Sequence, residues 1–216
     1  MRHLKDVVFL SDYDHADVKA WSGINYHLLK ELRKKSNLID VGKVGIPIIV
    51  KAYFFLVKTW VKIFLKKKYL YQRTALYSYF ITRDIRKKLS LSPGVPIITT
   101  SSMIAGCVKG NESKIILYID ATFFQMIDYY PEFTNLWGKN ISYGIQQENN
   151  AFKKASKIFV ASNWSERSIV NDYGIHKSKV AVVGLPQNVS ERHLLKQVCN
   201  PRPYAPGISV LFVGVD

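Results

Sequence analysis

The sequence of 216 residues is poor in cysteine and lacks any long apolar stretch at its start. Its two cysteines, Cys107 and Cys199, lie far apart, so they match neither a disulfide framework nor a metal or redox spacing. The apolar run near the N-terminus, Val7–Leu10, is too short for the core of a secretory signal peptide. We therefore expect a cytoplasmic protein in a reducing compartment.

Several catalytic motifs are also missing. None of the five histidines stands at metal-ligand spacing from a cysteine or glutamate, and neither a nucleophile elbow nor a phosphate-binding loop motif occurs. Asp12 and Asp14 form an Asp-x-Asp pair that could chelate a divalent ion, but we interpret them as polar loop residues. The sequence thus predicts no metal site and no cofactor, and it argues against zinc enzymes, hydrolases and kinases.

Acidic residues are scarce, and the resulting positive charge is concentrated. The chain has 31 Lys and Arg against 16 Asp and Glu, a formal net charge of +15. Residues 43–88 hold twelve basic residues and a single acidic one, Asp84. A concentrated basic segment predicts attraction to a polyanion, either an anionic membrane surface or nucleic acid.

Short apolar runs rich in β-branched residues alternate with amphipathic stretches along the chain. Continuous runs of this kind are typical of buried parallel strands. The pattern predicts an α/β fold, a Rossmann-like parallel sheet flanked by helices. The expected strands are 7–10, 38–41, 96–100, 115–119, 158–160 and 180–183, and the expected helices are 24–35, one beginning at 47, 140–155 and 164–173.

A change of composition near the C-terminus predicts a domain boundary. Residues 199–207 contain three prolines and a glycine, which no helix or central strand accommodates. The following apolar run resembles a first strand. We expect a Rossmann-like domain over 1–198, a linker over 199–207, and the first strand of a truncated second domain over 208–216.

The stretch from Ile46 to Leu65 is apolar apart from a narrow stripe of lysines, which continues to residue 66. It is long enough to cross a bilayer, but each lysine at the centre would cost about 2.5 to 3.5 kcal/mol. Lying in the membrane interface is cheaper, because the lysines then attract anionic headgroups. The alternative is that the apolar face packs in the core and the lysines are merely solvated. The stripe consists of Lys51, Lys58, Lys62 and Lys66.

A series of passages is similar, in order, to those of one enzyme family. They are Ser22-Gly23, Asp120 to Phe124, Glu148 ahead of Lys157 to Trp164, Asp172 to Ile175, and Leu211 to Asp216. In these residues, which span nearly the whole chain, the sequence resembles glycosyltransferase family 4.

The resemblance implies the N-terminal, acceptor-side half of a GT-B fold, in which two Rossmann-like domains face each other across a cleft. It implies retaining, metal-independent transfer of a sugar from a nucleotide-sugar donor to a glycan or lipid-linked glycan acceptor, as in cell-surface polysaccharide biosynthesis. The donor-binding residues of the family would follow Asp216. The chain alone is therefore expected to be inactive or nearly so.

Ligands of doubly wound sheets bind beyond the carboxyl ends of the strands, which places the candidate site residues. We expect Ser22 and Gly23, at a helix N-terminus, to meet the donor diphosphate; a plain tight turn is the alternative. Asp120 aligns with a position that the family fills with His or Asp. We take it as the catalytic candidate, which would orient or deprotonate the acceptor hydroxyl or stabilise positive charge, with a helix or turn cap as the alternative. The residues expected to line the cleft are Asp12, Thr122, Ser162, Asn163 and Asn188.

A second hypothesis remains open. The chain could be a non-catalytic module that binds a membrane surface or another polyanion through its basic segment. No known nucleic-acid-binding module is recognisable, so nucleic acid is not an expected partner. Under both hypotheses, the transferase domain and the non-catalytic module, the expected partner of the basic segment is an anionic membrane surface rather than nucleic acid. The protein would then lie on the inner face of the membrane.

Overall fold

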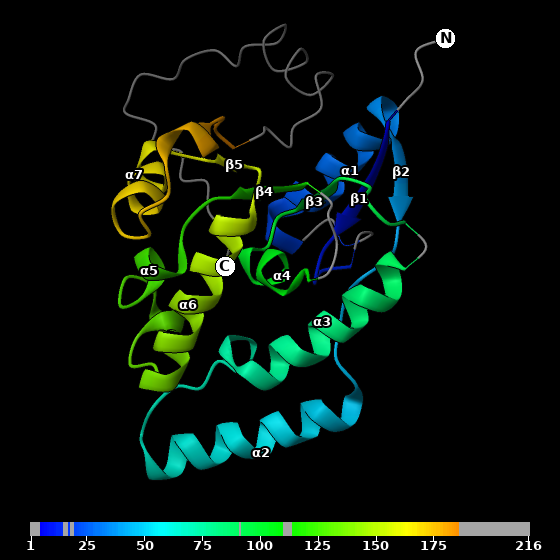
Figure 1. Cartoon of the computed structure of the whole chain (residues 1–216). Helices are drawn as coiled ribbons and strands as arrows, with labels where there is room; N and C mark the ends of the chain where they lie inside the picture. The colour runs from blue at the N-terminus through cyan, green and yellow to red at the C-terminus, as the bar shows by residue number, and fades with distance from the viewer. Residues whose placement is uncertain (1–4, 15–16, 18–19, 91, 110–113, 186–216) are drawn as a thin grey trace, which may run out of the picture. The chain divides into compact units, whose positions relative to one another are not determined.

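In the part of the chain that the structure describes, six parallel strands form a sheet at the centre of the fold (Figure 1). The computed structural model describes residues 5–14, 17, 20–90, 92–109 and 114–185, all within one unit that spans Met1–Pro186. The predicted linker at 199–207, the strand at 208–216 and Asn188 lie outside the described residues.

The predicted α/β, Rossmann-like fold is confirmed. The sheet has the order β2-β1-β3-β4-β5-β6, and every neighbouring pair is parallel. Each strand lies within one residue of its predicted boundaries, because buried parallel strands need continuous apolar runs. The strands are β1 Asp6–Leu10, β2 Asn37–Asp40, β3 Ile97–Thr99, β4 Ile115–Ile119, β5 Lys157–Val160 and β6 Val180–Val182.

The order of the strands reverses next to β1. The chain passes from β1 to β2 on one side and then returns to β3 on the other, so that Val8 is in register with Ile39 of β2 and with Ile97 of β3. Open parallel sheets bind ligands outside the carboxyl ends of the strands at such a reversal. The topology therefore predicts a ligand site in the space beyond Leu10 and Thr99, where β1 and β3 end.

Helices cover the sheet and extend beyond it. In Figure 1, α3, α4 and α6 lie together below the sheet, and α2 is the outermost helix, beneath α3. Serine and threonine side chains begin several of them, since a hydroxyl at this position accepts a backbone N–H of the first turn. The helices are α1 Ile24–Lys35, α2 Ile48–Phe64, α3 Ala75–Leu89, α4 Ser102–Cys107, α5 Phe123–Met126, α6 Gly138–Lys154 and α7 Asn163–Asn171, with 3₁₀ turns η1 Ala20–Gly23, η2 Tyr71–Arg73, η3 Pro131–Phe133 and η4 Lys177–Lys179.

One hydrophobic core joins the sheet to the helices below it, and two glycines allow the helices to approach closely. A Cβ on Gly106 of α4 would stand 2.9 Å from the carbonyl oxygen of Gln147 in α6. A Cβ on Gly144 of α6 would stand 2.3 Å from Cε1 of Phe123. These contacts fix α6 against α4 and α5, and α6 carries a glutamate that reaches the site described below.

Candidate functional site

A hollow of about 310 Å³ lies over the carboxyl ends of β1, β3 and β4, at the reversal of strand order. Asp12 follows β1, the segment 100–103 follows β3, and Asp120 follows β4. Arg73 of η2 and Glu148 of α6 complete its polar wall. The hollow thus brings together Asp12 and Asp120, which the sequence analysis places in the cleft. It adds two charged residues, Arg73 and Glu148, which the sequence analysis does not place there.

Glu148 is a buried carboxylate with three donors from three parts of the chain. Oε1 accepts a hydrogen bond from Ser102 Oγ at 2.6 Å, and Oε2 accepts one from the backbone N–H of Phe123 at 2.6 Å and another from the Tyr173 hydroxyl. Burial raises the pKa of Tyr173, and the negative charge of Glu148 raises it further, so the phenol stays a donor. Glu148 therefore ties α4, α5 and the end of α7 together beneath the hollow.

Arg73 supplies the positive charge of this wall. Its guanidinium lies 4.2 Å from the centre of the Phe123 ring, and Nη1 donates to Gln147 Oε1 at 3.5 Å. Burial lowers the pKa of Arg73, while the charges of Glu148 and Asp12 act in the opposite direction. Because an arginine remains protonated in proteins, the hollow holds a fixed cation that interacts electrostatically with the carboxylates of Glu148 and Asp12.

Asp12 has an oxygen without a partner. Its Oδ1 is buried and accepts no hydrogen bond from any residue that the structure describes. Burial raises the pKa of Asp12, and a hydrogen bond from its own backbone and the positive charges of Lys43 and Arg73 only partly oppose this rise. A buried acceptor without a donor costs free energy that a ligand hydroxyl would recover. Asp12 is thus suited to accept a hydrogen bond from a polar ligand.

Asp120 is exposed, and its carboxylate accepts a hydrogen bond from a neighbouring indole. Oδ1 accepts from the backbone N–H of Ala121 at 2.8 Å, and Oδ2 accepts from Trp21 Nε1 at 3.2 Å. Trp21 has a φ of 48°, in the left-handed region that costs a residue other than glycine about 1 to 3 kcal/mol, and its ring lies 5.9 Å from that of Tyr118. The strained backbone places an indole donor beside an exposed carboxylate, which keeps further lone pairs for a ligand.

The predicted phosphate loop forms a turn into α1. Gly23 is buried, adopts a φ of 75° and stands at the N-cap of the helix, which explains why glycine is needed. The backbone of Ser22 belongs to η1, and its side chain lies outside what the structure describes. The tight turn expected as the alternative is therefore present, and the contact of Ser22 and Gly23 with a diphosphate stays a prediction.

Three other residues predicted to line the cleft are not brought to this hollow. Thr122 is buried as the N-cap of α5, and its Oγ1 lies 2.8 Å from Ser168 Oγ. Ser162 caps α7 by accepting from the N–H of Ser165, and Asn163 is the exposed first residue of that helix. These polar residues follow strands, as expected, but two of their side chains serve the helix N-termini instead.

Sequence reasoning did not assign Arg73, Trp21 or Glu148 to the site. Arg73 stands in a short turn between two helices and carries no periodic signal. Glu148 did leave a signal, because it falls on the buried stripe of α6. An acidic residue at a core position of an amphipathic helix needs partners, so it marks a polar network.

A second surface stands out on α2. Only Val50, Phe54 and Val61 of this helix are buried, and the ring of Phe54 stacks on Tyr71 at 5.2 Å. The outer face, here named the α2 apolar face, consists of side chains that are each more than half exposed: Ile48, Ile49, Tyr53, Phe55, Leu56, Trp60, Ile63 and Phe64. Soluble surfaces rarely carry an apolar patch of this kind without a partner.

Three of the four predicted membrane-surface lysines border this face. Lys51, Lys58 and Lys62 are exposed on α2, between its buried stripe and its apolar face when the helix is projected at 100° per residue. Lys66 is exposed too, but the helix ends at Phe64 and Lys66 follows it with a φ of 51°, so its predicted place on the helical stripe is corrected. Across the described part of the chain, no helix has both the length and the apolar character needed to cross a membrane.

Among the residues that the structure describes, no three His, Cys, Asp or Glu side chains lie close enough together to hold a metal ion. The hollow is instead a site of fixed charges and free hydrogen-bond acceptors.

Comparison of the chain with models of known protein families finds no match, and comparison with curated proteins finds none either.

Proposed function

We propose that the chain is the acceptor-side domain of a glycosyltransferase, with the hollow above β1, β3 and β4 as its acceptor site. The observation that carries the proposal is the exposed carboxylate of Asp120, held by Trp21 beside the reversal of strand order. The resemblance to glycosyltransferase family 4 supports it. The donor would be a nucleotide-sugar, the reaction retaining and metal-independent, and the acceptor a glycan or lipid-linked glycan.

The lining of the hollow suits one sugar residue. Carboxylate oxygens of Asp120 and Asp12 would accept hydrogen bonds from acceptor hydroxyls, and Trp21 and Phe133 offer apolar ring surface. The volume, about 310 Å³, is at the lower end of the range for small-molecule sites. Asp120 would orient the reacting hydroxyl and take up its proton, or stabilise positive charge at the reacting carbon.

The test is sugar transfer by the product of the full-length gene, with a panel of labelled nucleotide-sugars and membrane lipid extract as acceptor. We expect Asp120→Asn to lower kcat by about 100-fold or more, as loss of a general base does. The matched control is Asp128→Asn, an exposed acid at a φ of 58° that asparagine tolerates. Equal activity of wild type and Asp120→Asn would remove Asp120 from the chemistry. Absence of transfer from every donor would favour the non-catalytic module.

We further propose that the α2 apolar face docks on an anionic membrane surface. Lysines along one edge and rings on the outer face match a helix that lies in the membrane interface. Each basic residue near an anionic surface contributes about 1 kcal/mol. Docking would bring the hollow to an acceptor that stays in the membrane, and the same surface would serve the non-catalytic alternative.

Sedimentation with phospholipid vesicles tests this docking. We expect binding to vesicles with anionic lipid, much weaker binding to neutral vesicles, and a loss of about tenfold or more in the double variant Trp60→Ala/Phe64→Ala. Tyr129→Ala, which removes an exposed ring elsewhere, serves as the control. Lys58→Gln/Lys62→Gln should weaken only the binding to anionic vesicles. Equal binding of all variants to both vesicle types would refute the docking.

A further inference from the structure

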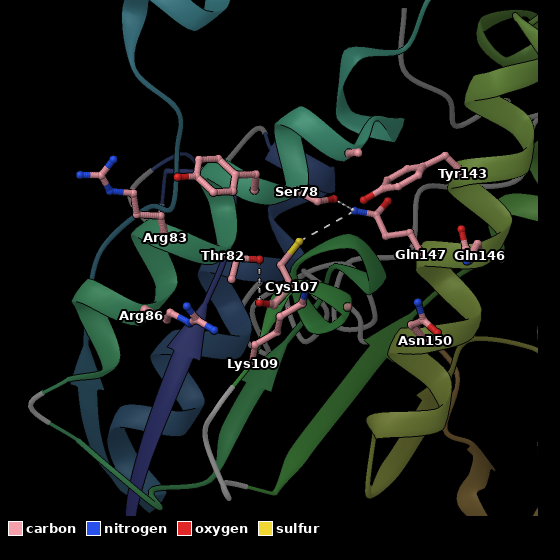
Figure 2. Close-up of a pocket in the computed structure, with 13 residues that line it drawn as sticks. Ser78, Thr82, Arg83, Arg86, Cys107, Lys109, Tyr143, Gln146, Gln147 and Asn150 are labelled. Carbon is pink, nitrogen blue, oxygen red and sulfur yellow. Dashed lines mark hydrogen bonds between the residues drawn. The ribbon is translucent and has the colours of Figure 1, made fainter.

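A second hollow, of about 500 Å³, lies between α3, α4 and α6 (Figure 2). In Figure 2, α3 and α6 stand on either side of it, and Cys107 at the end of α4 lies between them. It shares no lining residue with the hollow above the sheet. Three cationic side chains, Arg83, Arg86 and Lys109, line it, and its lining contains no acid.

Within the described residues, no carboxylate forms an ion pair with Arg83, Arg86 or Lys109. The acidic residue of the same helix, Asp84, accepts instead from the N–H of Gly45 at 3.1 Å. Arginines that gather around a hollow without a counter-charge create a positive potential there.

A fourth cation stands at the same end of α4. Lys154 Nζ donates to the carbonyl oxygens of Gly106 and Val108, at 2.8 and 3.0 Å. Burial lowers the pKa of Lys154, and the charge of Lys109 lowers it further. Mutual repulsion among these side chains is a cost that a bound anion would remove.

The floor of the hollow is polar and held in place. Gln147 Nε2 donates to Ser78 Oγ at 2.8 Å and approaches Cys107 Sγ at 3.9 Å, while Thr82 Oγ1 donates to the carbonyl oxygen of Cys107 at 3.1 Å. The wall on α6 adds a phenol and two amides, from Tyr143, Gln146 and Asn150. Neutral groups of this kind pair with the hydroxyls of a ligand, whereas the cations pair with its negative charge.

We propose that this hollow binds a phosphate group carried on a polyhydroxylated ring, either a soluble sugar phosphate or the headgroup of a phosphorylated inositol lipid. Arginine forks match phosphate oxygens in pairs, and the volume lies within the range of small-molecule sites. The inference does not depend on sugar transfer in the other hollow, because the two sites have no lining residue in common.

Titration calorimetry on the full chain tests the site with glucose 6-phosphate, with glucose as the uncharged control, and with vesicles that contain phosphatidylinositol phosphate or only phosphatidylglycerol. We expect Arg86→Gln and Lys109→Gln each to raise Kd by about tenfold. The matched control is Lys87→Gln, which removes the same charge from the next residue of α3 but does not line this hollow.

The arms separate the two sources. Binding of glucose 6-phosphate that depends on Arg86 and not on Lys87 supports the proposal with a soluble ligand. Binding of the inositol lipid alone, with the same dependence, supports it with a headgroup. The proposal is overturned by equal binding of glucose, by equal effects of Arg86→Gln and Lys87→Gln, or by no binding in any arm.

Discussion

The charges of Glu148 and Arg73 should stabilise the folded protein jointly. Replacing Glu148 with Gln keeps the size of the side chain and a carbonyl oxygen for the N–H of Phe123 and the hydroxyl of Tyr173. The new amide can donate to Ser102 Oγ, which is able to accept. Glu148→Gln therefore removes the charge while the hydrogen bonds persist.

The expected loss in the free energy of unfolding can be worked out from the groups that Glu148 contacts. Three hydrogen bonds lose their charge assistance, at roughly 0.5 to 1 kcal/mol each, and Arg73 loses a buried counter-charge. We expect Glu148→Gln to lower the free energy of unfolding by about 3 kcal/mol and Arg73→Met by about 2 kcal/mol. The double variant should lose about 2 kcal/mol less than the sum, because each single change removes the attraction between Arg73 and Glu148 and the second change cannot remove it again.

Urea unfolding at neutral pH, followed by circular dichroism, measures this coupling. Glu132→Gln, at an exposed acid of η3, provides the control and should change stability by less than about 0.5 kcal/mol. Strictly additive losses would show that Arg73 and Glu148 act independently. A neutral effect of Glu148→Gln would show that hydrogen bonding alone, without the charge, accounts for the buried network.

Three further substitutions test other parts of the site. The pKa of Asp12 is raised above its ordinary value of 3.8, so the protonated carboxyl stabilises the fold at low pH, and this stability is lost as pH rises through the raised pKa. Asp12→Asn should therefore be more stable than wild type by about 1 kcal/mol at pH 7 and equally stable below pH 4. Urea unfolding of both proteins at the two pH values measures the difference. Gly144→Ala should lower the urea midpoint by an amount equal to about 2 kcal/mol, because the added Cβ displaces the buried Phe123 ring despite the better helix propensity of alanine. Trp21→Phe should leave the thermal unfolding midpoint nearly unchanged but lower sugar transfer severalfold, because Asp120 loses its indole donor.

The fold could be predicted because its determinants are local. The inner strands are short apolar runs, and a parallel sheet buried on both faces is the natural place for such runs; the edge strand β2, with Asn37 and Asp40 exposed, is the exception. Helix α1 matched its expected range, Ile24–Lys35, since amphipathic spacing and basic residues at its end define it. Helix α4 was not delimited, because its six residues are too few to show a period.

The site could be predicted only in part, because one sequence signal serves two purposes. A polar residue after a strand can face the ligand cleft or cap the next helix. Asp12 and Asp120 line the hollow, whereas Thr122 and Ser162 cap α5 and α7. Spacing does not distinguish these roles, since both lie at the carboxyl edge of the sheet. Arg73 reaches the site only through tertiary packing, which no local pattern encodes.

The fold uses only part of the basic segment 43–88: Arg73 faces Glu148 and Asp12, and Lys88 donates to the carbonyl oxygen of Val41. Structural charges are normally paired, yet the described residues include no salt bridge that involves a basic side chain between 43 and 88. Lys51, Lys58 and Lys62 border the α2 apolar face, and Arg83 and Arg86 line the hollow beside α3. Like charges that lie close together repel each other, and we propose that anions outside the chain offset this repulsion at these two places. The two proposed partners, a membrane surface at the α2 apolar face and a phosphate group in the hollow beside α3, are therefore tested by separate variants.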